Sequence, residues 1–121
     1  MVPGVSAEFE TFTRRAAPVV REPVVALQRR GVLSLNRAAY ELLGEPTAVE
    51  LLFDRAGQRI GLRPVAGDAP HAYRVRKQPG SATYLIGAKA FLQFYGIPHD
   101  RARRWGAALL DGVLVADLEG T

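Results

Sequence analysis

One pattern of residues is present twice in the chain, and this internal repeat constrains the fold more than any other feature. Residues 33–40 (Leu-Ser-Leu-Asn-Arg-Ala-Ala-Tyr) return as residues 84–91 (Tyr-Leu-Ile-Gly-Ala-Lys-Ala-Phe). Each run continues through apolar residues to a glycine, Gly44 or Gly96, with a proline two positions later. Apolar stretches separated by glycine-containing turns follow in both copies, as is typical of β-hairpins. The repeat predicts two strand-strand-helix-strand-strand units.

In the first copy, the pattern predicts strands over residues 24–27 and 32–35, followed by a short helix. Asn36 is a suitable N-cap for this helix because its side-chain oxygen accepts a hydrogen bond from an otherwise unpaired amide. Leu35 before the cap and Tyr40 within the helix have the spacing of a hydrophobic staple. A helix of two to three turns needs packing of this kind, since its own propensity does not hold it.

The second copy predicts the same elements with different residues. Residues 71–77 alternate between apolar and basic side chains and predict the first strand, and Gly87 takes the place of the helix cap. Phe91 and Phe94 lie on the following helix at a spacing that predicts core packing. The dipeptide Asp111-Gly112 predicts a type I′ turn between the last two strands.

The length of 121 residues predicts one domain. We expect residues 1–18, which lack periodicity, to form a loosely ordered N-terminal arm. Residues 19–121 are expected to form a single domain of two repeats, 19–64 and 71–119, joined by a linker over 65–70. The fold class that follows is mainly β with short helices (α+β), arranged as a small pseudo-twofold β-barrel.

The composition bears on the cellular location of the protein. The chain has no cysteine, which excludes disulfides and thiolate metal sites and is compatible with a reducing cytoplasm. Its apolar stretches are shorter than the roughly 18 residues that a membrane span needs. The first thirteen residues contain Glu8 and Glu10 but no Lys or Arg, unlike a signal peptide. We therefore expect a cytoplasmic protein that does not bind membranes.

The charge balance is basic, with sixteen Lys and Arg residues against twelve Asp and Glu residues and a net charge of +4. All of the basic residues except Lys77 and Lys89 are arginines, which form planar, bidentate contacts with phosphates and base edges. A net charge of this size is compatible with nucleic-acid binding but does not require it.

The first copy contains four segments with a specific arrangement of apolar residues and glycines: residues 30–35 (Arg-Gly-Val-Leu-Ser-Leu), 42–44 (Leu-Leu-Gly), 49–54 and 60–62. Together these segments resemble the AbrB/MazE family of bacterial and archaeal transition-state regulators and antitoxins. In that family, two such units from two chains interlock into a swapped-hairpin β-barrel. Because this chain carries both units, the resemblance implies a monomeric pseudo-dimer with this barrel, or a homodimer of such chains.

The resemblance also implies a DNA-binding surface, which the family builds from arginines of the first strand, the following turn and the helix. The matching basic residues are Arg29, Arg30 and Arg37, with Arg74, Arg76 and Lys77 substituting in part in the second copy. This chain departs from the family at Tyr40-Glu41, where relatives often carry an Arg pair, and its turn 78–81 has no charge. An asymmetric surface with non-specific or weakly specific backbone contacts is therefore expected.

The sequence contains few other candidate sites. The run Arg101 to Trp105 fits either phosphate binding with Trp105 stacked on a base, or a buried Trp105 with an arginine packed over it. His71 and His99 have no third ligand at a suitable spacing, so no metal site is predicted. No nucleotide-binding, hydrolase or metalloprotease motif is present, and neither an enzymatic activity nor a cofactor is predicted.

Two functions remain open from the sequence. The first is a small DNA-binding protein, an AbrB-like transcriptional regulator that contacts DNA through an arginine-rich face. The alternative is a protein-interaction module, antitoxin-like or a scaffold, that keeps the barrel but has lost DNA binding. In that alternative, the N-terminal arm is the segment expected to contact a protein partner.

Overall fold

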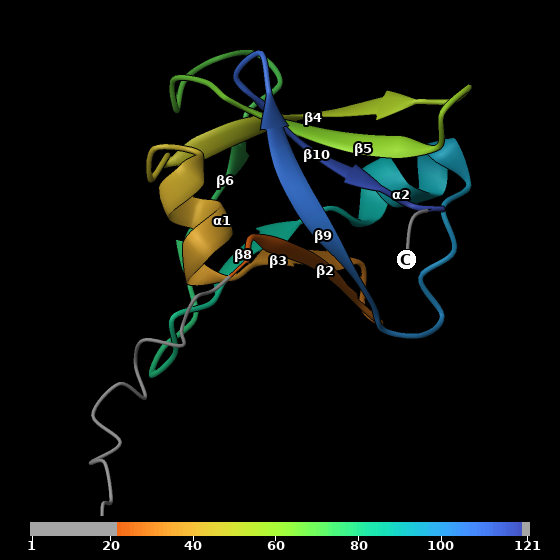
Figure 1. The fold of residues 1–121 in the computed structure, drawn as a ribbon, viewed down its shortest axis with the longest axis horizontal. Helices are drawn as coiled ribbons and strands as arrows, with labels where there is room; N and C mark the ends of the chain where they lie inside the picture. The colour runs from red at the N-terminus through yellow and green to blue at the C-terminus, as the bar shows by residue number, and fades with distance from the viewer. Residues whose placement is uncertain (1–21, 120–121) are drawn as a thin grey trace, which may run out of the picture.

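Strands β2 (Val24–Gln28) and β3 (Val32–Leu35) form a hairpin at the start of residues 22–119, the part of the chain that the computed structural model describes (Figure 1). The predicted arm lies outside these residues. In β2, Val25 and Leu27 are fully buried, while the residues between and after them are more exposed. This alternation shows that one face of the hairpin lies against the core. Gly31 closes the turn with a φ of 83°, a conformation that favours glycine.

Helix α1 (Arg37–Leu42) begins at the predicted cap. The Asn36 Oδ1 atom accepts hydrogen bonds from the amide of Ala39 at 2.9 Å and from the amide of Val24 at 3.0 Å. Asn36 therefore starts the helix and also fixes it to the beginning of β2. Gly44 follows the helix with a φ of 88°, as expected of a glycine that ends a helix in the left-handed conformation.

Strands β4 (Ala48–Asp54) and β5 (Arg59–Pro64) form the first predicted hairpin. The prediction of one continuous strand over residues 71–77 was wrong, because this segment forms two strands of two residues each, β6 (Tyr73–Arg74) and β7 (Arg76–Lys77). Strand β6 pairs with β4, whereas β7 pairs with β8. The chain changes partners at Val75, whose amide donates to the Thr47 carbonyl at 2.9 Å.

Strand β8 (Tyr84–Gly87) precedes helix α2 (Lys89–Tyr95). Gly87 was predicted to cap this helix, and that prediction was wrong. Gly87 is the last residue of β8, paired with Val32, so the helix begins one residue later, after Ala88, without a side-chain cap. Relative to the alignment of the two repeats, the strand ends and the helix begins one residue later in the second copy than in the first. Gly96 ends α2 with a φ of 67°, as predicted.

The last hairpin joins β9 (Arg103–Leu110) to β10 (Val113–Asp117). Its turn residues, Asp111 and Gly112, have φ values of 50° and 78°. A type I′ turn requires positive φ at both central positions, so the backbone agrees with the turn predicted from the sequence.

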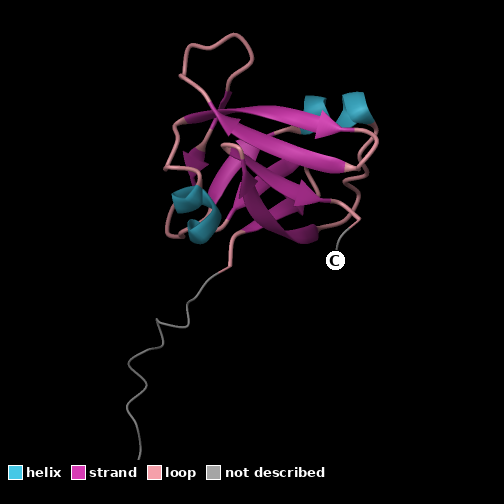
Figure 2. Ribbon diagram, turned by 45° about the horizontal axis from the view of Figure 1, so that its top comes forward, coloured by secondary structure: helices cyan, strands magenta, loops and turns pink. Residues whose placement is uncertain are grey.

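The strands of residues 22–119 belong to one antiparallel sheet, in the order β6-β4-β5-β10-β9-β2-β3-β8-β7. Figure 2 shows the strands wrapped around one another, with the two short helices at the periphery. The two edge strands of the sheet, β6 and β7, are separated in the chain by Val75 alone, so the sheet curls into a nearly closed barrel. The first strand of each copy pairs with the hairpin of the other: β2 with β9, and β6 with β4. The two copies are therefore interleaved in the sheet.

A single cluster of buried residues fills the barrel, with side chains from both copies. Leu35 and Phe91 belong to it, as the sequence predicts, together with Ile86. Phe94 was predicted to join them, and this prediction was wrong: its side chain is 74% exposed. Because α2 begins one residue late, Leu92 occupies the fully buried position on this helix.

Candidate nucleic-acid interface

The basic face is the outer surface of β9, β2, β3, β8 and β7, together with the turns and helix starts at the two ends of β3. A cross-strand row of side chains crosses this surface. The pairing registers place five residues in this row: Arg104, Ala26, Ser34, Leu85 and Arg76. Their neighbours along each strand, such as Trp105, Leu33 and Ile86, are buried, so the row lies on the outer side of the barrel. The arginine at each end is exposed.

The two arginines at the ends of this row are separated by three uncharged residues. Adjacent strands lie about 4.8 Å apart, so four steps from Arg104 to Arg76 span roughly 19 Å along the sheet. Between them, Ala26 and Leu85 are partly exposed, whereas Ser34 is 6% exposed and contributes little to the surface. The major groove of B-DNA is about 12 Å wide. Arginines with this separation therefore have the reach to contact phosphates on both sides of a groove.

At one end of β3, here called the turn end, three basic residues lie side by side. Arg29 and Arg30 occupy the β2–β3 turn and are exposed. Gly31 in this turn packs against α2 so closely that an added Cβ would lie 2.9 Å from the Cβ of Lys89. The Ala88 amide donates to the Gly31 carbonyl at 2.9 Å, which fixes the turn on the helix start. The two copies thus build the turn end together.

The sequence did not single out Lys89 or Arg104 as parts of this surface. Arg104 was considered only with Trp105, and Lys89 only as a helix residue. Both enter the basic face through contacts between distant segments, since Arg104 pairs with Ala26 across β2 and β9. Each is exposed. These contacts cannot be predicted from the residues next to Lys89 or Arg104 in the sequence.

At the other end of β3, here called the helix end, the cations are engaged with neighbouring groups. The Arg37 Nε atom donates to Glu41 at 2.8 Å, and its Nη1 atom lies 3.4 Å from the Tyr84 hydroxyl. The bond to Glu41 raises the pKa of Arg37 above its ordinary value. The Lys77 Nζ atom donates to the Ser81 carbonyl at 2.6 Å. The charge of Arg37 is thus partly neutralised.

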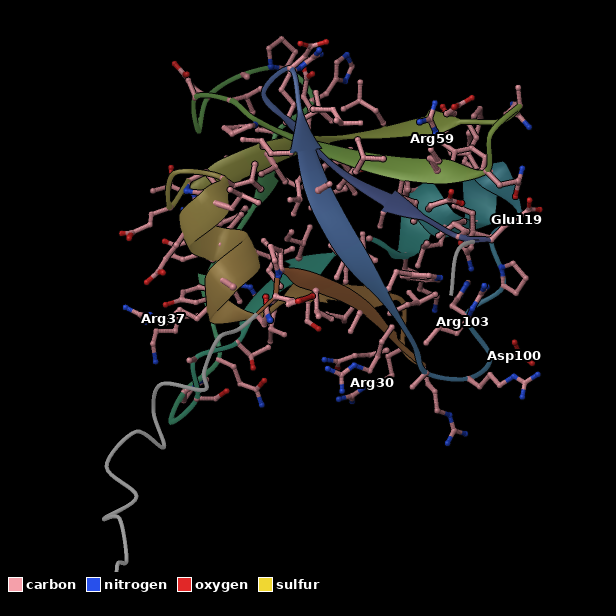
Figure 3. The ribbon with its side chains drawn as sticks, viewed as in Figure 1. Arg30, Arg37, Arg59, Asp100, Arg103 and Glu119 are labelled. Atoms are coloured by element: carbon pink, nitrogen blue, oxygen red, sulfur yellow. The ribbon has the colours of Figure 1, made fainter. Side chains whose placement is uncertain are left out.

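The structure places most of the predicted residues around the basic face, but Arg74 lies on β6, which pairs with β4. Arg30 and Arg37 lie at the two ends of β3 and on the lower side of the molecule in Figure 3. Arg76 follows Arg74 two residues later, across Val75, and both are exposed. The predicted set therefore borders the basic face, with Arg29 and Arg30 at the turn end and Arg37 and Lys77 at the helix end.

The opposite half of the barrel, formed by β4, β5 and β10, has a different charge pattern. The arginines of its strands are paired: Arg59 with Asp54 at 2.7 Å and Arg63 with Glu50. Arg55, in the turn between β4 and β5, is exposed and lies outside the ion pairs of residues 22–119. The amide of Gly57 donates to Asp54 at 3.0 Å and, with Arg59, lowers the pKa of this carboxyl. Figure 3 shows Arg59 on the far side of the barrel from Arg30.

The ion pairs found among residues 22–119 leave most cations of the basic face without a carboxylate partner in that part of the chain. The pairs join Arg37 to Glu41, Arg59 to Asp54 and Arg63 to Glu50. The exposed basic residues outside these pairs are Arg29, Arg30, Arg55, Arg74, Arg76, Lys77, Lys89, Arg101 and Arg104. Most of them belong to this half of the described barrel, whereas Arg55 lies in the β4–β5 turn of the other half.

Trp105 is not available to stack on a base, because it is 4% exposed and belongs to the core. The Arg103 guanidinium lies 4.9 Å from the centre of the Trp105 ring and donates to the Leu118 carbonyl at 3.1 Å. Of the two interpretations of this segment, the structure supports the buried tryptophan with an arginine packed over it.

A second surface lies beside helix α2. Phe94 projects from the helix next to a hollow of about 410 Å³, which is lined by Leu51, His71, Tyr73, Ala90, Phe91 and Tyr95. The rings of Phe94 and Tyr95 meet edge to face, with centroids 4.8 Å apart. The guanidinium of Arg55 lies 4.9 Å from the centre of the Tyr95 ring. Sequence periodicity assigned Phe94 to the core, which concealed this surface.

The two histidines border different hollows. His99 lines a hollow with Arg29 and Asp100, and its Nδ1 atom lies 3.1 Å from the Ile97 carbonyl. His71 borders the hollow beside Phe94. Within residues 22–119, no three His, Asp or Glu side chains are grouped as they would be around a metal ion. In the same part of the chain, no helix has the length and apolar character needed to cross a membrane.

Comparisons with known proteins identify no relative: no family model, curated protein or solved structure matches this chain.

Proposed function

We propose that this protein binds DNA through the basic face and acts as a small transcriptional regulator. The observation that carries the proposal is the separation of charge in the barrel. Exposed cations without carboxylate partners among residues 22–119 lie around β2, β3, β7 and β8, whereas the arginines at 59 and 63 are paired with acidic residues. A positive surface on one side of a small domain attracts the DNA backbone.

The proposed fold type is the swapped-hairpin barrel of the AbrB/MazE family, built here by one chain. The strand pairing supports this proposal, since each copy contributes its hairpin to the first strand of the other copy. The central pairs β3·β8 and β5·β10 also join the two copies. A single chain that supplies both units avoids the entropy cost of association. Comparison of the backbones of 24–64 and 73–117 with each other and with a swapped-hairpin barrel tests this assignment.

Binding on this surface is expected to be mainly electrostatic. Each phosphate that an arginine or lysine neutralises releases condensed counterions, so the affinity falls by roughly 0.9 log units per log unit of salt for each contact. The exposed turn that carries Arg29 and Arg30 is fixed on the start of α2, so these arginines contact DNA without a rearrangement of the turn. The side chains of Arg76 and Arg104, at the two ends of the row, contact the DNA backbone in this proposal.

A salt titration of the full chain with duplex DNA tests the function. The double variant R74A/R76A should bind more weakly, and its salt slope should fall by the amount expected for about two phosphate contacts. The matched control R59A/R63A removes the same charge from the opposite half of the barrel and should bind DNA nearly as the unmodified protein does. Absence of binding at low salt, or equal losses in both double variants, would remove the proposal.

The second candidate function, a protein-interaction module, is favoured by one observation: the exposed Phe94 beside an aromatic hollow. A large exposed apolar side chain next to a hollow of similar chemistry is typical of protein-binding surfaces. If this function is the correct one, F94A will abolish recovery of a protein partner that R29A/R30A still recovers. The DNA-binding proposal predicts that F94A leaves DNA affinity unchanged.

A further inference from the structure

We infer that the protein recognises a DNA sequence without inverted symmetry, reading bases mainly from the turn end of the basic face. The inference rests on the proposed DNA binding and concerns the kind of sequence bound. It starts from the relation between the two copies. Exchange of the copies maps β2 onto the β6–β7 segment, β3 onto β8 and α1 onto α2, and the order of strands in the barrel is unchanged by the exchange. The basic face is centred on the β3·β8 pair, so its two ends are equivalent in backbone topology.

The side chains at these two equivalent ends differ. The β2–β3 turn presents Arg29 and Arg30, whereas the corresponding β7–β8 turn, residues 78–81, consists of Gln, Pro, Gly and Ser. The helix beside the first turn begins with Lys89, which has no ion pair among residues 22–119. The helix beside the second turn begins with Arg37, which is bonded to Glu41 at 2.8 Å. Of these two ends, as residues 22–119 build them, the turn end alone presents arginines without an ion pair.

The two strands that flank the β3·β8 pair, β2 and the β6–β7 segment, also differ in charge, but here the second copy carries the arginines. The outward positions of β2 include Val24 and Ala26, but those of the equivalent segment are Arg74 and Arg76. The protein therefore has cations beside β7 that are placed to bind the DNA backbone, and a turn with two adjacent arginines before β3. No rotation that exchanges the two copies superposes this charge pattern on itself.

Phosphate contacts alone do not distinguish the two directions along DNA, because they position a protein without reading sequence. Base contacts do, and arginine is the residue that most often reads guanine, by bidentate bonds to its O6 and N7 atoms. Arg29 and Arg30 project from a turn held by Gly31 against the second helix, so they are the best placed for this role. Gln78, the one long polar side chain of the other turn, pairs with adenine rather than guanine. The two ends therefore recognise different bases.

A symmetric dimer binds sequences whose inverted repeats mirror its twofold axis. This pseudo-symmetric chain should instead select a motif with guanine at one end only. Loss of the turn arginines should lower the preference for that motif over an altered sequence by roughly 5- to 150-fold, the range for a bidentate base contact. Loss of Arg74 and Arg76 should weaken binding to both sequences by the same factor, since phosphates are common to both.

The experiment has two stages and uses the full chain. First, the protein selects binders from a pool of random duplexes, and the enriched motif is examined for symmetry. Second, because the chain has no cysteine, Q28C and A82C each provide a unique attachment point for an iron chelate that cleaves nearby DNA. Gln28 lies at the turn end, Ala82 lies beyond the other turn, and both are exposed. We expect each chelate to cut one end of the motif, and the two to cut opposite ends.

A palindromic motif, no enriched motif, or cuts of equal strength at both ends from each chelate would overturn this inference while leaving DNA binding intact. Failure to retain any DNA at low salt would overturn the proposed function itself. The variants R29A/R30A and R74A/R76A, measured on the motif and on its altered form, provide the second readout. Equal loss of preference in both variants would also overturn the assignment of base reading to the turn.

Discussion

The rings of Tyr40 and Tyr84 are stacked, with centroids 3.7 Å apart and planes 8° from parallel. Tyr40 belongs to α1 in the first copy, and Tyr84 begins β8 in the second. Tyr84 is 7% exposed, so the stack closes one end of the barrel over the core. Burial raises the pKa of Tyr40 above its ordinary value of 10.0. The stack therefore joins the two copies through side chains where their strands already pair.

Truncation of this stack should destabilise the barrel. Y40A removes a ring that packs on the core and leaves space above Tyr84, so we expect a loss on the order of 3 kcal/mol in the free energy of unfolding. Y40F keeps the ring and should lose far less. Urea unfolding of both variants, followed by circular dichroism, measures the difference. Equal stability of Y40A and the unmodified protein would show that the stack contributes nothing.

The two phenylalanines of α2 should respond differently to truncation. Phe91 is 6% exposed and meets Phe53 edge to face at 6.4 Å, so F91A should cost about 3–5 kcal/mol. Phe94 is 74% exposed, and F94A should change stability by less than about 0.5 kcal/mol. Thermal unfolding of the pair measures both effects. A large loss in F94A would contradict its exposed position.

Asn36 should be sensitive to substitution although it lies at the surface. N36A removes the acceptor for the amides of Ala39 and Val24, and the loss of a cap costs about 0.5–2 kcal/mol. The control N36D keeps the acceptor but loses the bond that the Asn36 amide donates to the Glu22 carbonyl at 2.8 Å. We expect N36D to fall between the unmodified protein and N36A in urea unfolding. If N36A is as stable as N36D, the cap is not stabilising.

The carboxyl of Asp54 should give the barrel a dependence on acid pH. The amide of Gly57 and the guanidinium of Arg59 stabilise its ionised form, so its pKa in the folded protein lies below the ordinary value of 3.8. A lowered folded pKa contributes stability above the unfolded value, and this contribution is lost as the pH falls through the folded pKa. D54N should therefore lower the melting temperature at pH 7, and the difference should shrink only below about pH 4. A difference that is constant from pH 7 to pH 2 would contradict this account.

The sequence predicted the elements that local chemistry specifies. Asn36 as a cap, Gly44 and Gly96 after the helices, and the Asp111-Gly112 turn each depend on a few neighbouring residues, and the structure confirms them. Predictions that assumed equivalent copies were less accurate. Gly87 matches Asn36 in the sequence alignment of the repeats, but its pairing with Val32 extends β8 and delays the helix.

The remaining errors concern contacts between segments that lie far apart in the chain. The alternation of residues 71–77 fits one strand, but the Val75 amide pairs with Thr47 and divides the segment between two partners. Spacing placed Phe94 with the core, whereas the late start of α2 turns it outward. Likewise, Arg104 enters the basic face only because β9 pairs with β2. These relations depend on the assembled sheet, which no single stretch of sequence contains.

The short strands on either side of Val75 also determine where the barrel opens most easily. Each of β6 and β7 pairs through two residues, the fewest of any strand described here, so this seam should open before the longer pairs separate. Its arginines, Arg74 and Arg76, are among those proposed to hold DNA. A duplex bound across them would favour the closed seam, and by thermodynamic linkage anything that loosens the seam would weaken the complex. Closure of the barrel and occupancy of its surface would then be a single coupled equilibrium.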